Sequence, residues 1–203
     1  MPNTMIRLLA AASLSVVASA GIAAPVTYAL DPGHTHVFFS WTHFGFSHPA
    51  GRFDKIEGDF QFDDADPTKS SLTVTIPISS IDTGVARLDE DLRGADFFDA
   101  AKFPTATFKS AHVRRTGAHA LKVDGTLTIH GVTKPAILDV TINKIGMHPM
   151  AGRPAAGFDA TTIIKRSDFG IAKYVPNVSD EIAISISTEA MGPKVDAVGR
   201  GNP

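Results

Sequence analysis

Residues 125–135 have the sequence GTLTIHGVTKP, and this stretch decides the fold of the chain. Leu127 and Ile129 alternate with threonines and His130, which is the pattern of a strand that buries one of its two faces. Gly131 tolerates the positive φ that a tight turn requires. We therefore predict a β-hairpin in which Leu127 and Ile129 face an apolar interior and His130 is exposed in the turn.

The same alternation recurs along the rest of the chain and predicts an all-β protein. Short strands separated by turn residues, at the spacing seen here, are typical of a sandwich or a barrel. The alternating segments are residues 37–43, 56–62, 72–78, 106–108, 121–129, 136–143, 158–164 and 182–186.

One segment departs from the alternation, and we predict a short helix over residues 89–97. Asp89, Glu90 and Asp91 form an acidic first turn, which interacts favourably with the helix dipole, and we expect these side chains to face water. Pro104 limits any continuation of the helix. A helix at this position is expected to cover one mouth of a barrel.

The N-terminal residues have the features of a signal peptide, which we predict over residues 1–23. Arg7 precedes an uncharged run of apolar and small residues, and the run offers cleavage after Ala20 or Ala23. The alternative is an N-terminal membrane anchor, which the short and weakly hydrophobic run disfavours. The mature protein is then expected in the periplasm.

The remaining residues, about 180, have the length of one domain with a substantial core. We predict a barrel domain over residues 24–191 and a loosely ordered tail over residues 192–203. The formal net charge of −2 argues against a nucleic-acid partner, which would require a basic surface. The chain has no cysteine, which excludes disulfides, thiol catalysis and cysteine-based metal sites.

Catalytic signatures are lacking in the sequence, so we expect a binding protein and assign no catalytic residue. The sequence contains neither a G-x-S-x-G nucleophile motif nor a phosphate-binding glycine loop followed by lysine. The alternative is a metal-dependent hydrolase or a metal-binding protein that uses His34, His36 and His43, because two histidines on one strand face bind zinc when a third ligand joins them. Strand parity places His43 on the opposite face from His34, so our preferred prediction contains no metal and no cofactor.

The aromatic residues suggest what a barrel of this kind would hold. The chain has 13 Phe against 1 Trp and 2 Tyr, so its rings are mostly hydrocarbon. An eight-stranded barrel either fills its interior with side chains or holds one slim ligand, and both interpretations stay open at this point. Each buried CH₂ contributes about 0.8 kcal/mol, so a long acyl or isoprenoid chain would bind without a dedicated polar site.

Five stretches in the same order resemble the YceI-like family, the polyisoprenoid-binding exported proteins of bacteria. Each stretch carries a short motif of that family, and together they span nearly the whole predicted domain. They are Asp31-Pro32-Gly33-His34-Thr35, Gly51-Arg52-Phe53 with Gly58-Asp59-Phe60, residues 80–108, residues 125–135, and residues 166–182. Asp91 departs from the family pattern, because a histidine commonly precedes the leucine of the helix, and His36 is not a family position.

The resemblance implies an extended, lipocalin-like antiparallel barrel of eight strands with a short helix near one mouth. Its lumen would hold a long isoprenoid lipid, such as a quinone or a polyprenyl precursor, as the bound ligand. The resemblance also implies a homodimer and suggests a membrane cytochrome as a partner.

Strand parity then assigns side chains to the lumen, and three polar residues are expected near a mouth or in a buried network. The polar residues are His34, His43 and Arg166. The predicted lumen residues are Phe39, Trp41, Phe60, Phe62, Val74, Ile76, Phe108, Leu127, Ile129, Leu138, Val140, Phe158, Ile164, Ile182 and Ile184.

Overall fold

The computed structural model of the protein describes residues 25–194. The predicted signal peptide, residues 1–23, and the end of the predicted tail, residues 195–203, lie outside the described residues. The hydrogen bonding of the domain extends one residue past its predicted end, because the amide of Gly192 donates to the carbonyl oxygen of Pro154 at 2.8 Å.

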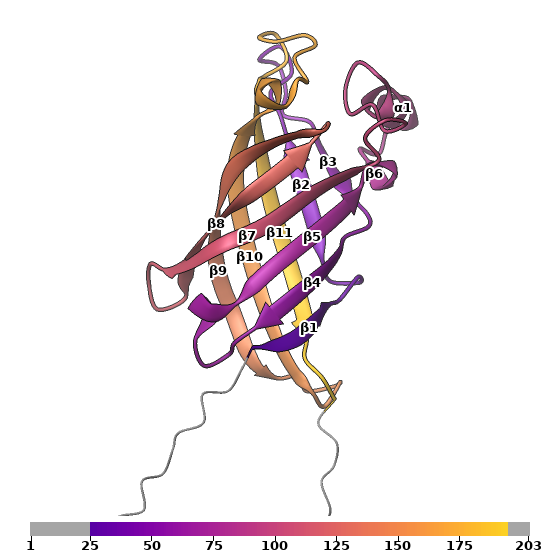
Figure 1. Ribbon diagram of the computed structural model, residues 1–203. Coiled ribbons are helices and arrows are strands. Elements are labelled where there is room, and N and C mark those ends of the chain that lie inside the picture. Colours follow the sequence, from indigo (N-terminus) through magenta and orange to yellow (C-terminus); the bar gives the residue numbers. More distant parts are fainter. Residues whose placement is uncertain (1–24, 195–203) are drawn as a thin grey trace, which may run out of the picture.

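The described residues form a closed antiparallel barrel, as predicted (Figure 1). Eight strands form the ring in the order β1-β4-β5-β7-β8-β9-β10-β11, and β1 closes it by pairing with β11. Farther along β11, β2 takes the place of β1, and β3 and β6 follow β2 in the same sheet. The strands are β1 Val26–Leu30, β2 His36–Ser40, β3 Ala50–Phe53, β4 Glu57–Phe62, β5 Ser71–Pro77, β6 Ile81–Asp82, β7 Thr105–Arg115, β8 Ala120–Ile129, β9 Val132–Met147, β10 Pro154–Lys165 and β11 Glu181–Met191.

The first barrel strand is broken into β1 and β2, which both pair with β11. The break contains Pro32, which cannot donate to a strand ladder, and a turn in which the amide of Gly33 donates to the Asp31 carboxylate at 2.8 Å. This local turn explains why strand pairing stops at Leu30 and resumes at His36.

The hairpin predicted from residues 125–135 is present between β8 and β9. Ile129 pairs with Val132, and His130 and Gly131 form the two-residue turn with φ values of 52° and 73°. Two successive positive φ values are typical of the type I′ turn that matches the twist of a hairpin.

The prediction that His130 is exposed is wrong. Its ring lies edge-on to Phe103, with centroids 4.7 Å apart, and its Nδ1 lies 3.1 Å from the carbonyl oxygen of Phe169. The turn packs closely against Phe103, since a Cβ on Gly131 would lie 2.4 Å from that ring. A short-range pattern could not show that a distant loop covers the turn.

The single α-helix of the described residues, α1, spans Ala86–Arg93 rather than the predicted 89–97. It ends where the amide of Gly94 bonds back to the carbonyl oxygens of Glu90 and Asp91. Three 3₁₀ turns lie at Pro67–Lys69 (η1), Ile78–Ser80 (η2) and Arg166–Phe169 (η3). Figure 1 shows α1 and the loop after η3 at the same end of the barrel, which we call the mouth.

The other end of the barrel is packed shut with side chains. Rings of Tyr28, Phe60, Phe62 and Phe158 contact one another there, mostly edge to face, with centroids 5.2–6.2 Å apart. A second layer above them contains Phe108, Val123, Leu138 and Ala160. The barrel is therefore solid from its closed end to about its middle.

Gly125 makes room for the ring that completes the second layer. A Cβ on Gly125 would lie 2.5 Å from Cζ of Phe108, which is closer than two carbons can approach. The missing side chain thus lets the Phe108 ring lie across the strand β8.

Candidate ligand cavity

A cavity of about 980 Å³ occupies the open half of the barrel, between the Phe108 layer and α1. This volume is at the upper end of the range for small-molecule binding sites. Inward-facing side chains of β2, β3, β5, β7, β8, β10 and β11 form its wall, and α1 with the loop after η3 borders its opening. Aliphatic and aromatic groups dominate the wall, and charged groups lie at the opening.

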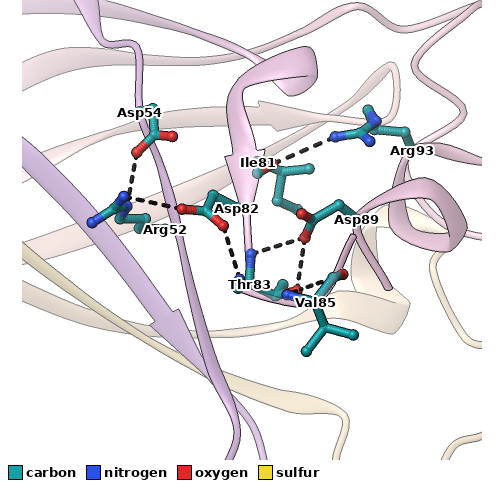
Figure 2. Close-up of polar contacts among 9 residues, drawn as sticks. Arg52, Asp54, Ile81, Asp82, Thr83, Val85, Asp89 and Arg93 are labelled. Carbon is teal, nitrogen blue, oxygen red and sulfur yellow. Dashed lines mark hydrogen bonds and ion pairs between the residues drawn. The ribbon is translucent and has the colours of Figure 1, made fainter. Parts of the chain in front are cut away.

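A buried carboxylate attaches α1 to the barrel (Figure 2). Asp89 accepts hydrogen bonds from the amide and the hydroxyl of Thr83 at 2.8 and 2.7 Å, and Asp89 is only 9% exposed. Arg93 donates to the carbonyl oxygen of Ile81 at 3.4 Å. The turn between β6 and α1 is therefore bonded to the helix that follows it.

The same corner is joined to β3 by ion pairs that Figure 2 also shows. Arg52 contacts Asp54 at 2.8 Å and Asp82 at 3.0 Å. Asp82 also accepts the amide of Gly84 at 2.8 Å. The expectation that Asp89 faces water is wrong, because this carboxylate replaces a side-chain N-cap in fixing the start of α1.

Truncation of this carboxylate is expected to loosen the helix. Asp89→Ala leaves the Thr83 amide without its partner in a half-buried corner, which costs about 1–3 kcal/mol of unfolding free energy. Limited trypsin digestion should then cut faster after Arg87 and Arg93. Asp89→Asn retains a carbonyl oxygen that accepts both bonds, so it should be cut at a rate close to that of the wild type; equal cutting of both variants would contradict this role.

Arg166 organises the opposite side of the mouth. Its Nε donates to the carbonyl oxygen of Ser179 at 2.9 Å, and its terminal nitrogens donate to those of Ile171, Lys173 and Val178 at 2.8–3.0 Å. One guanidinium thus holds a loop of ten residues, 170–179, against the barrel. Burial lowers the pKa of Arg166, and the nearby Asp180 carboxylate opposes this shift.

Asp180 is bound to the start of η3. It accepts the amide of Ser167 at 2.8 Å and the hydroxyl of Ser167 at 2.7 Å. Burial acts to raise the pKa of Asp180, but the hydrogen bonds from Ser167 and the nearby charges of Arg166 and Lys165 together outweigh it, and the pKa lies below its usual value. The carboxylate therefore stays ionised and supports the Arg166 loop.

Comparisons with known proteins place this geometry in a family. A family model described as "YceI-like domain" matches residues 28–190, which is nearly all of the described barrel. The chain belongs to the YceI-like family. Protein YceI of Escherichia coli O157:H7 is 38% identical over 182 residues, which are 89% of this chain and 94% of that protein. A UPF0312 protein of Azotobacter vinelandii is 37% identical over 188 residues, 91% of this chain and 97% of that one.

Solved structures share the architecture. BcnA of Burkholderia cenocepacia superposes with a TM-score of 0.72 at 28% identity, over 79% of this chain and 98% of that chain. A polyisoprenoid binding domain from Saccharophagus degradans superposes with a TM-score of 0.63 at 16% identity, over 83% of this chain and 99% of that chain. The second likeness establishes the fold alone.

In this YceI-like barrel, the structure divides the predicted lumen residues into two groups. Eight line the cavity: Phe39, Trp41, Ile76, Leu127, Ile129, Ile164, Ile182 and Ile184. Seven do not line it: Phe60, Phe62, Val74, Phe108, Leu138, Val140 and Phe158. Most of the second group pack in the two closed layers, because alternation reports which face a side chain occupies and not its depth along the barrel.

Several cavity residues had no assignment from the sequence. Leu88 and Leu92 on α1 face the opening, and their i, i+4 spacing is the signal that would have found them. Phe97, Phe98 and Ile171 come from irregular segments and Phe169 from the short 3₁₀ turn η3, and none of these is long enough to show a periodic pattern. Val37, Phe53 and Ala106 complete the wall, and all three follow the period of their strands.

Paired charges lie around the opening. Lys173 forms an ion pair with Asp96, and its Nζ lies 5.2 Å from the ring centroid of Tyr174 and 5.9 Å from that of Phe97. The hydrogen bond from Lys173 to Asp96 raises the pKa of the lysine. Arg87 pairs with Asp91 at 3.3 Å on α1.

The three polar residues assigned to a mouth or network lie in different places. Arg166 and His43 border the cavity. His34 is at the closed end, where its Nδ1 lies 3.2 Å from Asp31 and 3.8 Å from Glu189. The amide of Gly33 is the main cause that lowers the pKa of Asp31, with a further contribution from His34.

The proposed metal set of His34, His36 and His43 is not brought together. His34 and His36 border a second hollow beside Glu189, whereas His43 borders the cavity at the mouth. Within residues 25–194, the cluster with metal-ligating atoms within 4.8 Å of one another is Asp31, His34 and Glu189, and its histidine is exposed. The geometry therefore gives no support to the hydrolase alternative.

The chemistry of the cavity is that of an apolar receptacle. Every buried side-chain nitrogen or oxygen of the described residues has a hydrogen-bond partner. The buried polar groups near the cavity thus form hydrogen bonds within the protein, mostly to loops, and the interior offers a ligand mainly hydrocarbon contacts. Within the described part of the chain, the one α-helix is too short to cross a membrane.

Proposed function

We propose that this protein binds a long-chain isoprenoid lipid, a quinone or a polyprenyl precursor, and stores or carries it in the periplasm. The cavity carries the proposal, because it combines a volume of about 980 Å³ with an apolar wall and one polar opening. The fold shared with a polyisoprenoid binding domain supports the same ligand class. The periplasmic location rests on the signal peptide predicted over residues 1–23.

The tail would lie between the isoleucines of β8, β10 and β11, and the headgroup would stay among the charges of the opening. Each buried CH₂ contributes about 0.8 kcal/mol, so a few isoprene units suffice for tight binding. The affinity does not grow without limit, because ordering the chain offsets part of the gain. No catalytic step is required of any residue.

Lipid extraction of the purified, exported protein tests the proposal. Native mass spectrometry should detect a bound species, and organic extraction should identify it as an isoprenoid lipid. The delipidated protein should take up an isoprenoid quinone from detergent micelles. A protein that neither copurifies with such a lipid nor takes one up would contradict the proposal and favour a barrel filled by its own side chains.

Metal analysis tests the alternative. We expect no stoichiometric zinc in the purified protein, since His43 is separated from His34 and His36. Near-stoichiometric zinc that is lost on His34→Ala would favour the metal-dependent function. The homodimer stays a prediction, which a measurement of molecular mass in solution would check. The cytochrome partner also stays a prediction, which crosslinking in membranes would check.

The Phe108 layer is expected to set the greatest tail length that the cavity accepts. Phe108→Ala removes the ring beneath Leu127 and extends the cavity toward the closed end, at a cost of about 3–5 kcal/mol in unfolding free energy. The variant should gain affinity for longer tails relative to shorter ones in a competition assay. Phe158→Ala, which makes a similar hole in the bottom layer, is the control; it should leave the preference for tail length unchanged.

A further inference from the structure

Four exposed apolar residues gather around the opening of the cavity. Phe46 is 92% exposed, Tyr174 57%, Val85 55% and Phe44 50%. Tyr174 and Val85 themselves border the cavity, as does His43 at the base of the turn that carries Phe44 and Phe46. We call these four residues the mouth rim. Figure 1 shows the segments that carry them at one end of the barrel.

The turn that presents Phe46 is well formed. The amide of His43 donates to the carbonyl oxygen of Ser47 at 2.9 Å. The amide of Phe46 donates to the carbonyl oxygen of His43 at 3.0 Å. The amide of Phe44 donates to the carbonyl oxygen of Asn177 at 2.8 Å, which joins this turn to the loop that Arg166 holds. The rim aromatics are thus displayed on connected loops rather than on loose ends.

The charges that border the cavity balance one another. Three are cationic (Arg87, Arg166 and Lys173) and three are anionic (Glu90, Asp91 and Asp96). Lys173 pairs with Asp96 and Arg87 with Asp91, while Arg166 is occupied by backbone carbonyls. A surface with paired charges and exposed aromatic rings fits a neutral lipid surface, where aromatic side chains favour the boundary between headgroups and tails.

We propose that the mouth rim inserts into the surface of a zwitterionic phospholipid bilayer, so that the cavity opens toward the membrane. This inference rests on the proposed function, because an isoprenoid tail that passes through water loses the hydrophobic gain of every CH₂ in transit. Contact between rim and bilayer lets the tail move from one apolar environment to the other. The driving force is apolar insertion and not attraction to anionic lipids.

Flotation with phosphatidylcholine vesicles that contain no isoprenoid lipid tests the docking by itself. Wild-type protein should float with the vesicles to the same extent at low and high salt, because screening does not weaken apolar insertion. Phe46→Ser should lower the partition coefficient by roughly tenfold or more, the effect expected when one fully inserted aromatic ring is lost. Met150→Ser is the matched control, since Met150 is 91% exposed in the β9–β10 turn at the closed end, and it should bind vesicles as the wild type does.

Several outcomes would overturn the docking. One is that the wild type does not float with the vesicles. Another is that Phe46→Ser and Met150→Ser lower the partition coefficient equally. A third is that binding requires anionic lipid and disappears at high salt. A dimer that Phe46→Ser dissociates, with no vesicle binding, would assign the rim to a second copy instead. Uptake of an isoprenoid quinone from detergent micelles, measured in parallel, reports on the proposed function alone, so the failure of either idea is recognised separately.

Discussion

Replacing Ile129 by tryptophan is expected to lower the affinity for an isoprenoid chain by at least about tenfold while the barrel stays folded. Ile129 is the last residue of β8, only 9% exposed, and it lines the cavity opposite the isoleucines of β11. An indole at this position occupies volume that the tail requires. Because the cavity already offers free space, the larger side chain should cost no more than about 1–3 kcal/mol in unfolding free energy.

Titration of delipidated protein with an isoprenoid quinone measures this effect, and circular dichroism and thermal melting report the folded state. Ile163→Trp is the matched control, because Ile163 lies on β10, another strand of the cavity wall, but is 66% exposed on the outer face. Should the Ile129 variant unfold, Ile184→Phe narrows the cavity from the other wall with a smaller change. Unchanged affinity in a folded Ile129 variant would place the ligand outside this cavity.

Replacing Arg166 by methionine is expected to cause the largest loss of stability of any single change at the mouth. The variant keeps the apolar stem but leaves the carbonyl oxygens of Ile171, Lys173, Val178 and Ser179 without their donor. The variant loses four hydrogen bonds to a charged group and leaves partly buried carbonyl oxygens unsatisfied. Because both effects destabilise the folded state, we expect a loss of about 3–5 kcal/mol in unfolding free energy. Ligand affinity should fall as well, since the freed loop carries Lys173.

Urea denaturation measures the stability, and two further variants make the result specific. Arg166→Lys keeps the positive charge but offers a single nitrogen instead of a planar fork, so it should recover only part of the loss. Arg114→Met removes an exposed arginine that pairs with Asp124 at 2.8 Å, and it should have a far smaller effect. An Arg166→Met protein as stable as Arg114→Met would show that the four carbonyl contacts contribute little.

The sequence was sufficient for the barrel, which the family motifs implied where the alternation alone left a sandwich or a barrel, and for the direction of most strand faces. The hairpin of residues 125–135 has its turn at His130 and Gly131 as its pattern requires, and Ile182 and Ile184 face inward by the same rule. Periodicity depends only on neighbours along one strand, so it transfers directly to the structure. Strand β1, Val26–Leu30, was not predicted, since it is only five residues long and the turn at Asp31 separates it from β2.

The depth of each residue along the barrel was not predictable in this way. Phe60 and Ile129 show the same alternation, but one packs against other rings at the closed end and the other lines the cavity. The difference depends on which layers of the assembled barrel are filled, as with Phe108 over Gly125. The same limit explains His34, which lies in the turn between β1 and β2; the alternation of the following residues gave no sign that it lies at the end away from the mouth.

Because one end of the barrel is packed with side chains, the cavity is open at the mouth and closed at the other end. The lipid that we propose would enter and leave through the same opening, tail last on the way out, and would not pass from one end of the barrel to the other. Under this proposal, a donor membrane and an acceptor would have to contact the same end of the protein one after the other. Loading and delivery would then exclude each other in time, and an excess of either surface should slow exchange with the other.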